Sequence, residues 1–353
     1  MITNNYKGKK IEYHILQSFP VTCLNRDDVG SPKSAIVGGV SRARVSSQAW
    51  KRQVRLAMHE FGIKLAVRTK FVTDKIVKFC ETDDIPEEQI VETAQAIADK
   101  LTKDTLHFFT DTEAEALALY AAEIGFDKAA IDGKEVIKRH KKALGKSLAT
   151  LEGLDIALFG RMVAQAATLN VEAAASFSHA ISTHKSSAEI EFFTALDDEK
   201  PEEMEDAGSS HMGSLEFNSA TYYRYISIDL GQLVETLGGD EYLEKAIEAF
   251  TKALYVAVPY ARQSTQAGYN LWDYAKVFVR EGQGIQASFE NPVKSSGEGF
   301  LKPSIEQLNT FLESKEKLSG SLFRKIDEFT WGLNASFSID NLITGLQEAV
   351  KRV

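Results

Sequence analysis

The sequence predicts an α+β fold in which a β-sheet is combined with loops, helices and one long helical insertion. Apolar and polar residues alternate over 11–18 and 222–230, with the period of two that is typical of strands, and a further strand is predicted at 276–280. Between residues 82 and 146, by contrast, almost all the signals are helical. Helices are predicted again at 242–256 and from Ser304 onward, so strands and helices interleave along the chain.

The N-terminal part combines two predicted strands with a loop between them. The strand at 11–18 is expected to be half-buried, and a loop at 19–39 follows it. A short strand with β-branched ends is predicted at 40–45. Gly38 and Gly39 stand just before it, where they permit backbone conformations or close approaches that other residues resist.

A helix is predicted directly after this short strand. Ser46 and Ser47 are good N-cap residues, and Gly62 is the expected end of the helix. One face of the helix is apolar and carries Trp50, Val54, Ala57 and Phe61. The serine-capped start, with its backbone N–H groups, is a natural place for a phosphate.

The helical insertion contains three periodic segments. The first has Pro86 at its start and an apolar stripe at Ile90, Ala94, Ile97 and Leu101. The second, at 113–124, is stopped by Gly125. The third begins near Lys134 and is rich in lysine; Lys138, Lys141 and Lys142 form a possible second basic patch, although a solvated helix face is the commoner explanation.

Three further segments of the second half carry local predictions. The apolar run GLDIALFGRM, residues 153–162, predicts a buried strand that ends at a glycine turn. Residues 197–206 contain seven acids and are expected to form an exposed, mobile loop. Ser304 and Gln307 have the spacing of a capping box for the following helix.

Composition limits the class of protein. The chain has 353 residues, of which 44% are hydrophobic and 26% charged, as in ordinary globular proteins with one large core or two smaller ones. No stretch is expected to act as a signal peptide or to cross a membrane, so the cytoplasm is the expected compartment. The two cysteines, Cys23 and Cys80, form neither a disulfide framework nor a zinc-binding pattern and are expected in or beside the core.

Charge is distributed unevenly. The whole chain has a formal net charge of −9, yet residues 33–55 contain six basic residues and no acidic one. These are Lys33, Arg42, Arg44, Lys51, Arg52 and Arg55. A basic region on an acidic protein concentrates its field where a polyanion lies and repels the polyanion elsewhere. The charges alone leave two interpretations open: a track for nucleic-acid phosphates, or a solvated helix face.

The sequence offers little for catalysis. It has no P-loop, no dinucleotide-binding glycines, no G-x-S-x-G elbow and no C-x-x-C pair. No two histidines stand at i,i+4, so no helical metal pair is expected, and His179 and His184 are each expected to be structural. Asp27 and Asp28 follow Arg26 in a loop, where Asx-turn chemistry is the ordinary explanation. We therefore predict no catalytic residue, no metal and no cofactor.

Six blocks of sequence together point to a known family. In chain order they are CLNRDD (23–28), KSAIVGGVSRARVSSQAWKR (33–52), GLDIALFGRM (153–162), SHAISTHKSSAEIEFFTALDD (178–198), SSHMGSLEFNSATYYRY (209–225) and GFLKPSI (299–305). They closely resemble, in the same order, the CasC-type backbone subunit of the type I-E CRISPR Cascade complex. The helical segment at 63–148 and the last forty residues resemble it only loosely.

The resemblance implies a hand-shaped, non-enzymatic protein. Its palm, residues 1–62 and 149–353, is an RNA-recognition-motif-like (ferredoxin-like) sheet; its finger is the helical insertion at 63–148; its thumb is a protruding hairpin at 189–218. Copies stack head to tail along a CRISPR RNA inside a complex with other Cascade subunits. Each grips phosphates, kinks the RNA at intervals and presents the intervening bases for pairing with target DNA.

The resemblance also implies particular contacts. The positions that match the family's RNA contacts are Arg26, Lys33, Ser46, Gln48, Lys51, Arg55 and Met162. The thumb aromatics that wedge a base correspond to Phe192 and Phe193. Two features depart from the family: Val40 stands where a further basic residue is common, and Phe192 where Trp is common. The aromatic strand signature of RNA-recognition motifs is absent as well, so stacking of bases on the sheet is not expected.

Two other functions stay open. Related subunits of type III complexes cut target RNA with a loop aspartate, and Asp27 or Asp28 could be so placed, with a metal ion. Alternatively, the basic region could bind an acidic protein partner in an assembly.

Overall fold

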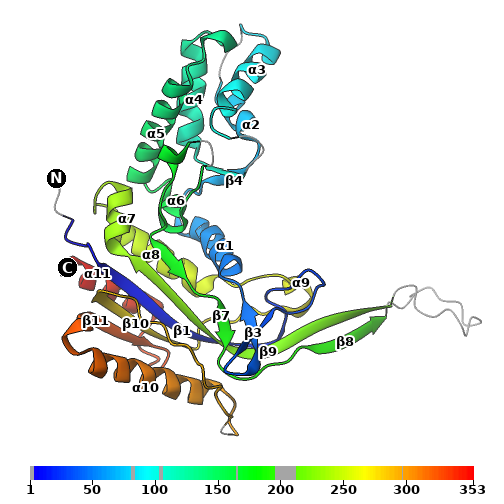
Figure 1. Ribbon diagram of the computed structural model, residues 1–353, viewed down its shortest axis with the longest axis vertical. Coiled ribbons are helices and arrows are strands. Elements are labelled where there is room, and N and C mark those ends of the chain that lie inside the picture. The colour runs from blue at the N-terminus through cyan, green and yellow to red at the C-terminus, as the bar shows by residue number, and fades with distance from the viewer. Residues whose placement is uncertain (1–3, 81–83, 103–105, 164–165, 195–211, 296) are drawn as a thin grey trace, which may run out of the picture.

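The computed structural model describes residues 4–80, 84–102, 106–163, 166–194, 212–295 and 297–353. It has the mixed α+β architecture that the sequence predicts, with an antiparallel sheet at its centre (Figure 1). The acidic run at 197–206 lies outside the described residues.

The main sheet has the strand order β11-β10-β1-β9-β7-β3-β2, and β6 and β8 also pair with β9. Its strands are β1 (Lys9–Thr22), β2 (Ser34–Val37), β3 (Val40–Val45), β6 (Ala175–Phe177), β7 (Ala180–Ser182), β8 (Glu189–Thr194), β9 (Met212–Asp229), β10 (Tyr274–Glu281) and β11 (Lys325–Trp331). All the pairings are antiparallel. The strands predicted near residues 40–45, 222–230 and 276–280 are thereby confirmed, except that Leu230 already begins a helix.

Strand β1 corrects the prediction of a half-buried strand. Every residue from Ile11 to Gln17 is buried, because β1 lies between β9 and β10 and helices cover both faces of the sheet there. Tyr13 faces a large helical layer, whereas Leu16 faces a single long helix on the opposite side. The polar residues of the alternating pattern therefore bury their side chains against partners: His14 Nδ1 lies 2.9 Å from Tyr223 Oη.

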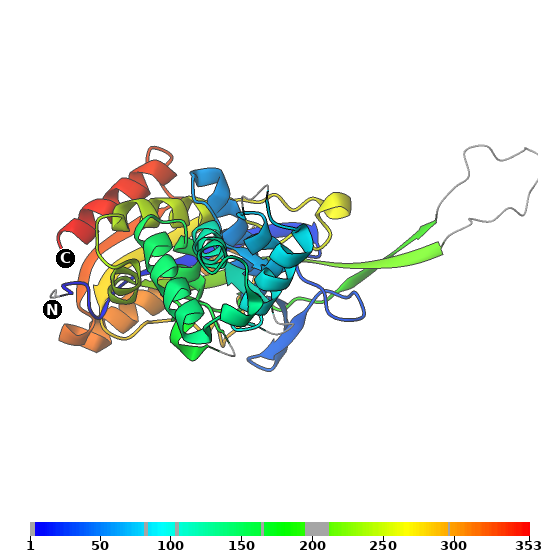
Figure 2. The same ribbon diagram turned by 90° about the horizontal axis from the view of Figure 1, so that it is seen from above.

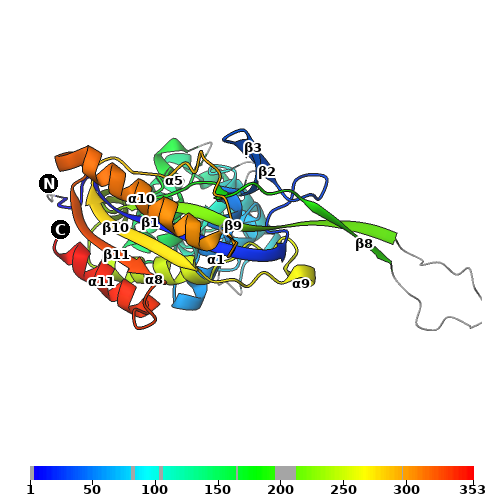
Figure 3. The same ribbon diagram turned by 90° about the horizontal axis from the view of Figure 1, so that it is seen from below.

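The two helical layers differ in size. One face of the sheet is covered by α1 (Ser47–Ala57), α6 (Leu154–Phe159), α7 (Leu230–Leu237), α8 (Leu243–Val256) and α11 (Ile339–Lys351). The other face is covered by α10 (Leu301–Ser319) (Figures 1 and 3). Leu308 and Leu312 of this helix pack against Tyr274 and Phe278. A short helix, α9 (Gln263–Gln266), lies in the loop before β10.

A helical part stands off the sheet at one side (Figure 1). It contains α2 (Val72–Val77), α3 (Glu87–Ala98), α4 (Asp111–Glu123) and α5 (Gly133–Ala149), with a small sheet of β4 (Val67–Thr69) and β5 (His107–Phe109). Helices α2, α3 and α4 and the first half of α5 share a core of their own, whereas Leu144 and Leu148 of α5 lie in the core under the main sheet. The predicted apolar stripe of α3 lies in the core of the helical part: Ile90, Ala94, Ile97 and Leu101 are all buried.

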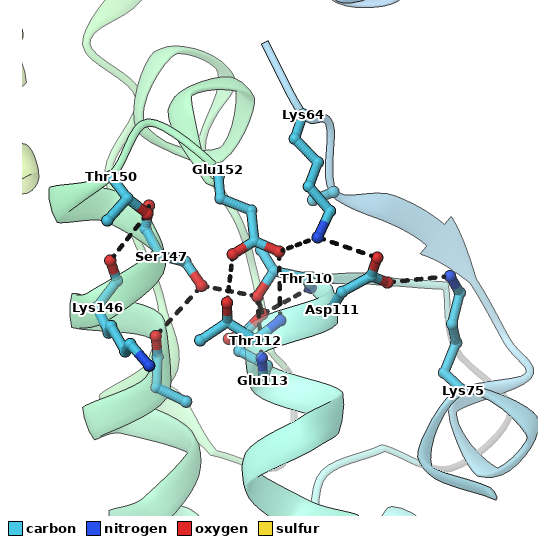
Figure 4. Close-up of polar contacts among 12 residues, drawn as sticks. Lys64, Lys75, Thr110, Asp111, Thr112, Glu113, Lys146, Ser147, Thr150 and Glu152 are labelled. Atoms are coloured by element: carbon cyan, nitrogen blue, oxygen red, sulfur yellow. Dashed lines mark hydrogen bonds and ion pairs between the residues drawn. The ribbon is translucent and has the colours of Figure 1, made fainter. Parts of the chain in front are cut away.

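Ion pairs hold the junction between this helical part and the sheet (Figure 4). Lys64 lies where the chain leaves the sheet and Glu152 where it returns, and Lys64 Nζ is 3.2 Å from a carboxylate oxygen of each of Glu152 and Asp111. Asp111 is the first residue of α4 and also pairs with Lys75. The hydroxyl of Thr112 donates to Glu152 as well. The two crossings of the chain are therefore tied to the N-terminus of one helix.

A buried cluster of charges lies beneath these exposed pairs. Glu113 Oε1 is 2.7 Å from Arg161 Nη1 and 2.8 Å from His140 Nε2, and all three side chains are shielded from solvent. Burial alone would raise the pKa of Glu113, but the neighbouring His140 and Arg161 lower it to about 2. Glu113 also completes a capping box with Thr110 at the start of α4. One carboxylate thus links two helices of the insertion to the segment after α6.

Strands β8 and β9 form a hairpin that projects beyond the sheet (Figures 2 and 3). Its register pairs Glu189 with Phe217 and Phe193 with Gly213. The second half of β9 then enters the sheet between β1 and the shorter strands β6 and β7. One strand therefore serves both as the wall of the hairpin and as a central strand of the sheet.

Two local predictions are wrong. Residues 154–159 form the helix α6 and not a strand; the predicted glycine turn at Gly160 is present, with φ of +80°. Ser304 does not cap α10, because that helix already begins at Leu301; the Ser304 hydroxyl is buried and lies 2.8 Å from Thr183 Oγ1. Gln307 instead donates to the carbonyl of Asn291.

Replacing Glu113 with Gln should destabilise the helical part strongly. The amide keeps the shape and can still cap α4, but it leaves the buried Arg161 without a negative partner, for which we expect a loss of about 3–5 kcal/mol in urea unfolding at pH 7. The pKa of Glu113 is lowered in the folded protein. The wild type should therefore exceed the variant in free energy of unfolding by the full amount at pH values above 4.5, the ordinary pKa of Glu113, and this difference should vanish as the pH falls toward about 2. The exposed Glu115 of the same helix is the control, since Glu115→Gln should change stability by less than about 0.5 kcal/mol. Equal stabilities of the two variants at pH 7 would contradict the role of the buried cluster.

Candidate nucleic-acid interface

The start of α1 is the centre of the candidate interface. Ser46 is its N-cap, with an extended backbone, and its hydroxyl accepts a hydrogen bond from Ala49 N at 3.2 Å. Ser46 N in turn donates to Asn25 Oδ1, which ties the cap to the loop between β1 and β2. The first turn of α1 contains no acidic residue, so nothing on the helix itself offsets the positive end of its dipole. The predicted N-cap is confirmed.

Basic residues surround this helix start. Burial lowers the pKa of His179, and the nearby charges of Arg44 and Lys33 lower it further. Its Nδ1 accepts a hydrogen bond from Ser47 N at 3.2 Å, so His179 supports the first turn as a neutral ring. Arg44 also donates from Nε to the carbonyl of Ser34 on the neighbouring strand. Two cations and the helix terminus therefore converge on one surface.

Lys51 is the most unusual member of the group. Burial lowers its pKa, and its ammonium lies 5.7 Å from the centre of the Phe177 ring. Within the described part of the chain no carboxylate lies within ion-pair distance of it. A half-buried amine that lacks an acidic partner is a costly arrangement in a free protein and a favourable one when an anion binds beside it.

Arg55 has a different environment from Lys51. Its guanidinium is 3.1 Å from the buried carboxylate of Asp155 and donates to the carbonyl of Ala66. Burial raises the pKa of Asp155 in spite of this pairing. Arg55 thus joins α1 to α6 at the junction with the helical part, and its predicted contact with RNA stays a prediction.

Arg42 is one of the six basic residues between Lys33 and Arg55, but it does not lie at the surface. It lies on the same side of β3 as Arg44, but it is buried, and its guanidinium donates to the carbonyls of Ser182 at 2.7 Å and Phe289 at 2.8 Å. Arg42 therefore fastens the β2–β3 hairpin to the loop before α10 and does not face solvent. Gly38 serves the same contact: its φ is +59°, and a Cβ there would come within 1.8 Å of the Glu290 carbonyl oxygen. The close approach that the glycine predicted is confirmed.

The remaining predicted residues are more scattered. Arg26 is exposed in the loop before β2, paired in a β-bridge with Pro32, and Gln48 is exposed on the first turn of α1. Met162 is 82% exposed and follows the anchored Arg161 at the junction with the helical part. Asp27 accepts hydrogen bonds from Val29 N and Ser31 N, the Asx-turn arrangement that its loop predicted.

The second basic patch lies on α5, in the part of the molecule that stands away from the sheet (Figure 1). Lys138 pairs with Glu135 of the same helix, whereas Lys141 and Lys142 are exposed. The patch is therefore separate from the start of α1, and its contact with nucleic acid stays a prediction.

The hairpin places Phe192 and Phe193 on opposite faces. Phe192 is 79% exposed, and Phe193 is 40% exposed. The Phe193 ring lies over its cross-strand partner Gly213, where a Cβ would come within 2.4 Å of the ring. Phe192 is thus free to contact another molecule, while Phe193 also stabilises the hairpin on which Phe192 stands.

His179 was expected to be structural, and the structure agrees: it supports the first turn of α1 by accepting a hydrogen bond from Ser47 N. The position of this contact was not predicted from the sequence, and Arg224 was missed altogether. Arg224 of β9 lies beneath the same helix, with its guanidinium carbon 3.6 Å from the centre of the Trp50 ring. Neither contact with α1 could be predicted from the sequence, because His179 and Arg224 are far from residues 46–50 along the chain. The antiparallel pairing of β7 and β9 with their neighbours brings both residues close to the helix.

No three His, Cys, Asp or Glu side chains come together as a metal ion would require within the described ranges. Among the described residues, no helix combines the length and the apolar character that are needed to span a bilayer.

Comparisons with known proteins place this fold in a family. The sequence profile described as CT1975-like protein matches residues 11–336, and the chain therefore belongs to the CT1975-like protein family. A solved structure titled "CRISPR RNA-guided surveillance complex, pre-nicking" contains a chain that is 27% identical, with a TM-score of 0.83 over 96% of this chain and 99% of that one. A chain from another structure, titled "CRISPR RNA-guided surveillance complex", is 25% identical, with a TM-score of 0.62 over 97% and 99% of the two chains. A search of curated proteins found no match.

The two hairpin aromatics should behave differently when they are truncated. Phe193→Ala uncovers Gly213 and removes a cross-strand contact, so hydrogen exchange of the backbone amides of β8 should become about threefold to fivefold faster. Phe192→Ala, the matched control on the opposite face, should leave this exchange unchanged. Equal acceleration in both variants would show that Phe193 has no special part in the hairpin.

Proposed function

We propose that this protein is the CasC-type backbone subunit of a type I-E CRISPR Cascade complex and binds CRISPR RNA through its phosphates. In this proposal the sheet with its covering helices is an RNA-recognition-motif-like palm, the helical part is a finger, and the β8–β9 hairpin is a thumb. The similarity to chains of two CRISPR RNA-guided surveillance complexes supports the assignment, since it extends over nearly the whole length of both chains. The protein would act in the cytoplasm, together with other subunits of the complex.

The single observation that carries RNA binding is the uncompensated positive charge at the start of α1. Lys51 is half-buried without a carboxylate partner among the described residues, beside a serine-capped helix start that lacks acids, in a chain of net charge −9. A phosphate would lie at the positive end of the helix dipole and pair with Lys51, Lys33 and Arg44. The acidic remainder of the surface would repel RNA and so confine it to this region.

The arrangement of sheet and helices favours RNA binding that does not depend on the base sequence. Helices cover both faces of the central strands, so the sheet offers no open platform on which bases could stack. Contacts to phosphates fix the position of a strand but carry no sequence information. A subunit that holds guides of any sequence needs this property, because the bases must stay free to pair with target DNA.

We assign the regular kinks of the RNA to the hairpin and to Met162. Phe192 and Met162 are large apolar side chains exposed at 79% and 82%, and both are suited to stacking against a displaced base. Copies of the chain would assemble head to tail, so that the hairpin of one reaches the RNA held by the next.

Charge reversal at the helix start should weaken RNA binding for every sequence alike. For the double variant Lys33→Glu, Lys51→Glu we expect the affinity for single-stranded RNA to fall by about tenfold or more. The slope of log K against log salt should become shallower by about 0.7 for each phosphate that the variant no longer neutralises. Fluorescence anisotropy with oligouridine and oligoadenosine over a salt series would measure both. Lys351→Glu, an exposed change on α11, is the control and should bind as the wild type does. A loss confined to one of the two oligonucleotides, or an unchanged affinity, would argue against phosphate binding here.

We further propose that the protein is not an enzyme. Both hydrogen bonds accepted by Asp27 are explained by the turn that it forms. The assembled complex should leave a complementary RNA intact in the presence of Mg²⁺, as followed by gel electrophoresis. Cleavage that disappears in Asp27→Ala or Asp28→Ala would establish a metal-dependent ribonuclease instead.

A further inference from the structure

Arg224 is a buried cation that stacks on the helix of the proposed RNA site. It lies on β9 opposite Ile15 of β1, and its side chain faces the helical layer that contains α1. Its guanidinium carbon is 3.6 Å from the centre of the Trp50 ring, which places the two groups in direct stacking contact. Arg224 is 2% exposed and Trp50 is 1% exposed.

The hydrogen-bonding capacity of this stacked pair is largely unused. Arg224 Nη1 donates to Gln17 Oε1 at 2.6 Å. In the described part of the chain, Arg224 Nε, Arg224 Nη2 and Trp50 Nε1 are buried without a hydrogen-bond partner. No carboxylate forms an ion pair with Arg224 there either, and burial lowers its pKa to about 9, which still leaves it charged at neutral pH.

Other buried arginines of the protein have partners that Arg224 lacks. Arg280 of strand β10 lies 2.8 Å from the buried Glu12, and Arg161 lies 2.7 Å from Glu113. Arg42 has no such acid but donates to three backbone carbonyls. Arg224 has one neutral amide oxygen and an aromatic ring. A buried charge without a counterion destabilises a folded protein, so a role outside stability is required to explain it.

The position of Trp50 suggests that role. Trp50 lies in the first turn of α1, one turn beyond the cap residue Ser46, whose carbonyl accepts its backbone N–H. Three positive groups lie near one another here: the N-terminal end of α1, Lys51 and Arg224. An acid neutralises none of them in the described residues, so together they favour a bound anion. In a poorly solvated interior the field of Arg224 is weakly screened and extends to the helix start.

We propose that Arg224 is a positioning residue for the RNA backbone: it supports Trp50 from below and adds a buried positive charge that raises the affinity of the first turn of α1 for phosphate without touching it. This inference rests on the proposed RNA-binding function. It implies that the buried charge of Arg224 destabilises the protein without RNA and that a bound phosphate offsets this destabilisation.

The test uses the full chain with Arg224→Met, Arg224→Gln and Arg224→Lys. Binding of a fluorescent oligouridine would be followed by anisotropy at several salt concentrations, and thermal stability by circular dichroism without RNA. Both neutral variants should bind about threefold to tenfold more weakly, the effect of one partly screened charge. Arg224→Met should be at least as stable as the wild type, and Arg224→Lys should bind within about twofold of it.

Several controls keep the outcomes separate. Lys351→Met removes one exposed charge on α11 and should not change binding, which excludes an effect of net charge. Because Arg224 makes no phosphate contact, its neutral variants should change the slope of log K against log salt less than Lys51→Met does. If the wild type does not bind RNA, the proposed function fails, whatever Arg224 does.

Three results would overturn the inference while leaving the proposed function intact. The first is wild-type affinity in both neutral variants. The second is a loss of affinity in Arg224→Lys that equals the loss in Arg224→Met. The third is a fall in thermal stability of both neutral variants in parallel with their affinity, since Arg224 would then be a structural residue only.

Discussion

Strand β1 pairs with β9 along almost its whole length, and residues 11–17 of β1 and 220–226 of β9 are buried on both faces. This pairing places each helical layer, because Tyr13 and Ile226 contact one layer while Leu16 and Tyr223 contact the other. It also anchors the hairpin, since β9 is continuous from Met212 in the hairpin to Asp229 at the start of α7. A slip of one residue in this register would exchange the two faces of the sheet and move Arg224 away from Trp50. The helical part, by contrast, is fixed by charges at its two crossings, where the exposed pairs of Lys64 and the buried cluster of Glu113 both lie at the N-terminus of α4.

Local signals in the sequence predicted much of the fold. The start of α1 was predictable because Ser46 has cap chemistry and Trp50 and Val54 have helical spacing. Helix α3 was predictable from its apolar stripe. The strand predicted at 154–159 failed because a short apolar run fits a buried strand and a buried helix equally well, and periodicity cannot separate them.

The candidate interface was predictable only in part, for a physical reason. The absence of acids between Lys33 and Arg55 located the basic region, but charge along a sequence does not reveal burial or pairing. Arg42 is held by carbonyls of residues 182 and 289, and Arg55 by Asp155; both sets of partners come from distant segments that only the folded chain brings near. Of the six basic residues, the fold thus directs two inward, and it adds His179 from the link between β6 and β7 and Arg224 from β9.

The pairing of buried charges distinguishes the structural positions of this protein from the positions of the proposed RNA site. The buried arginines with structural roles have partners, a carboxylate for Arg161 and Arg280 and backbone carbonyls for Arg42, because an unpaired charge in the interior is costly. At the start of α1 the same solution would defeat the proposed function, since a carboxylate beside Lys51 or Arg224 would compete with phosphate for the cation and repel it from the helix start. The proposed RNA binding therefore needs the absence of carboxylates at the start of α1. The acids elsewhere bring the chain to a net charge of −9, but they do not weaken phosphate binding as long as they lie outside this region.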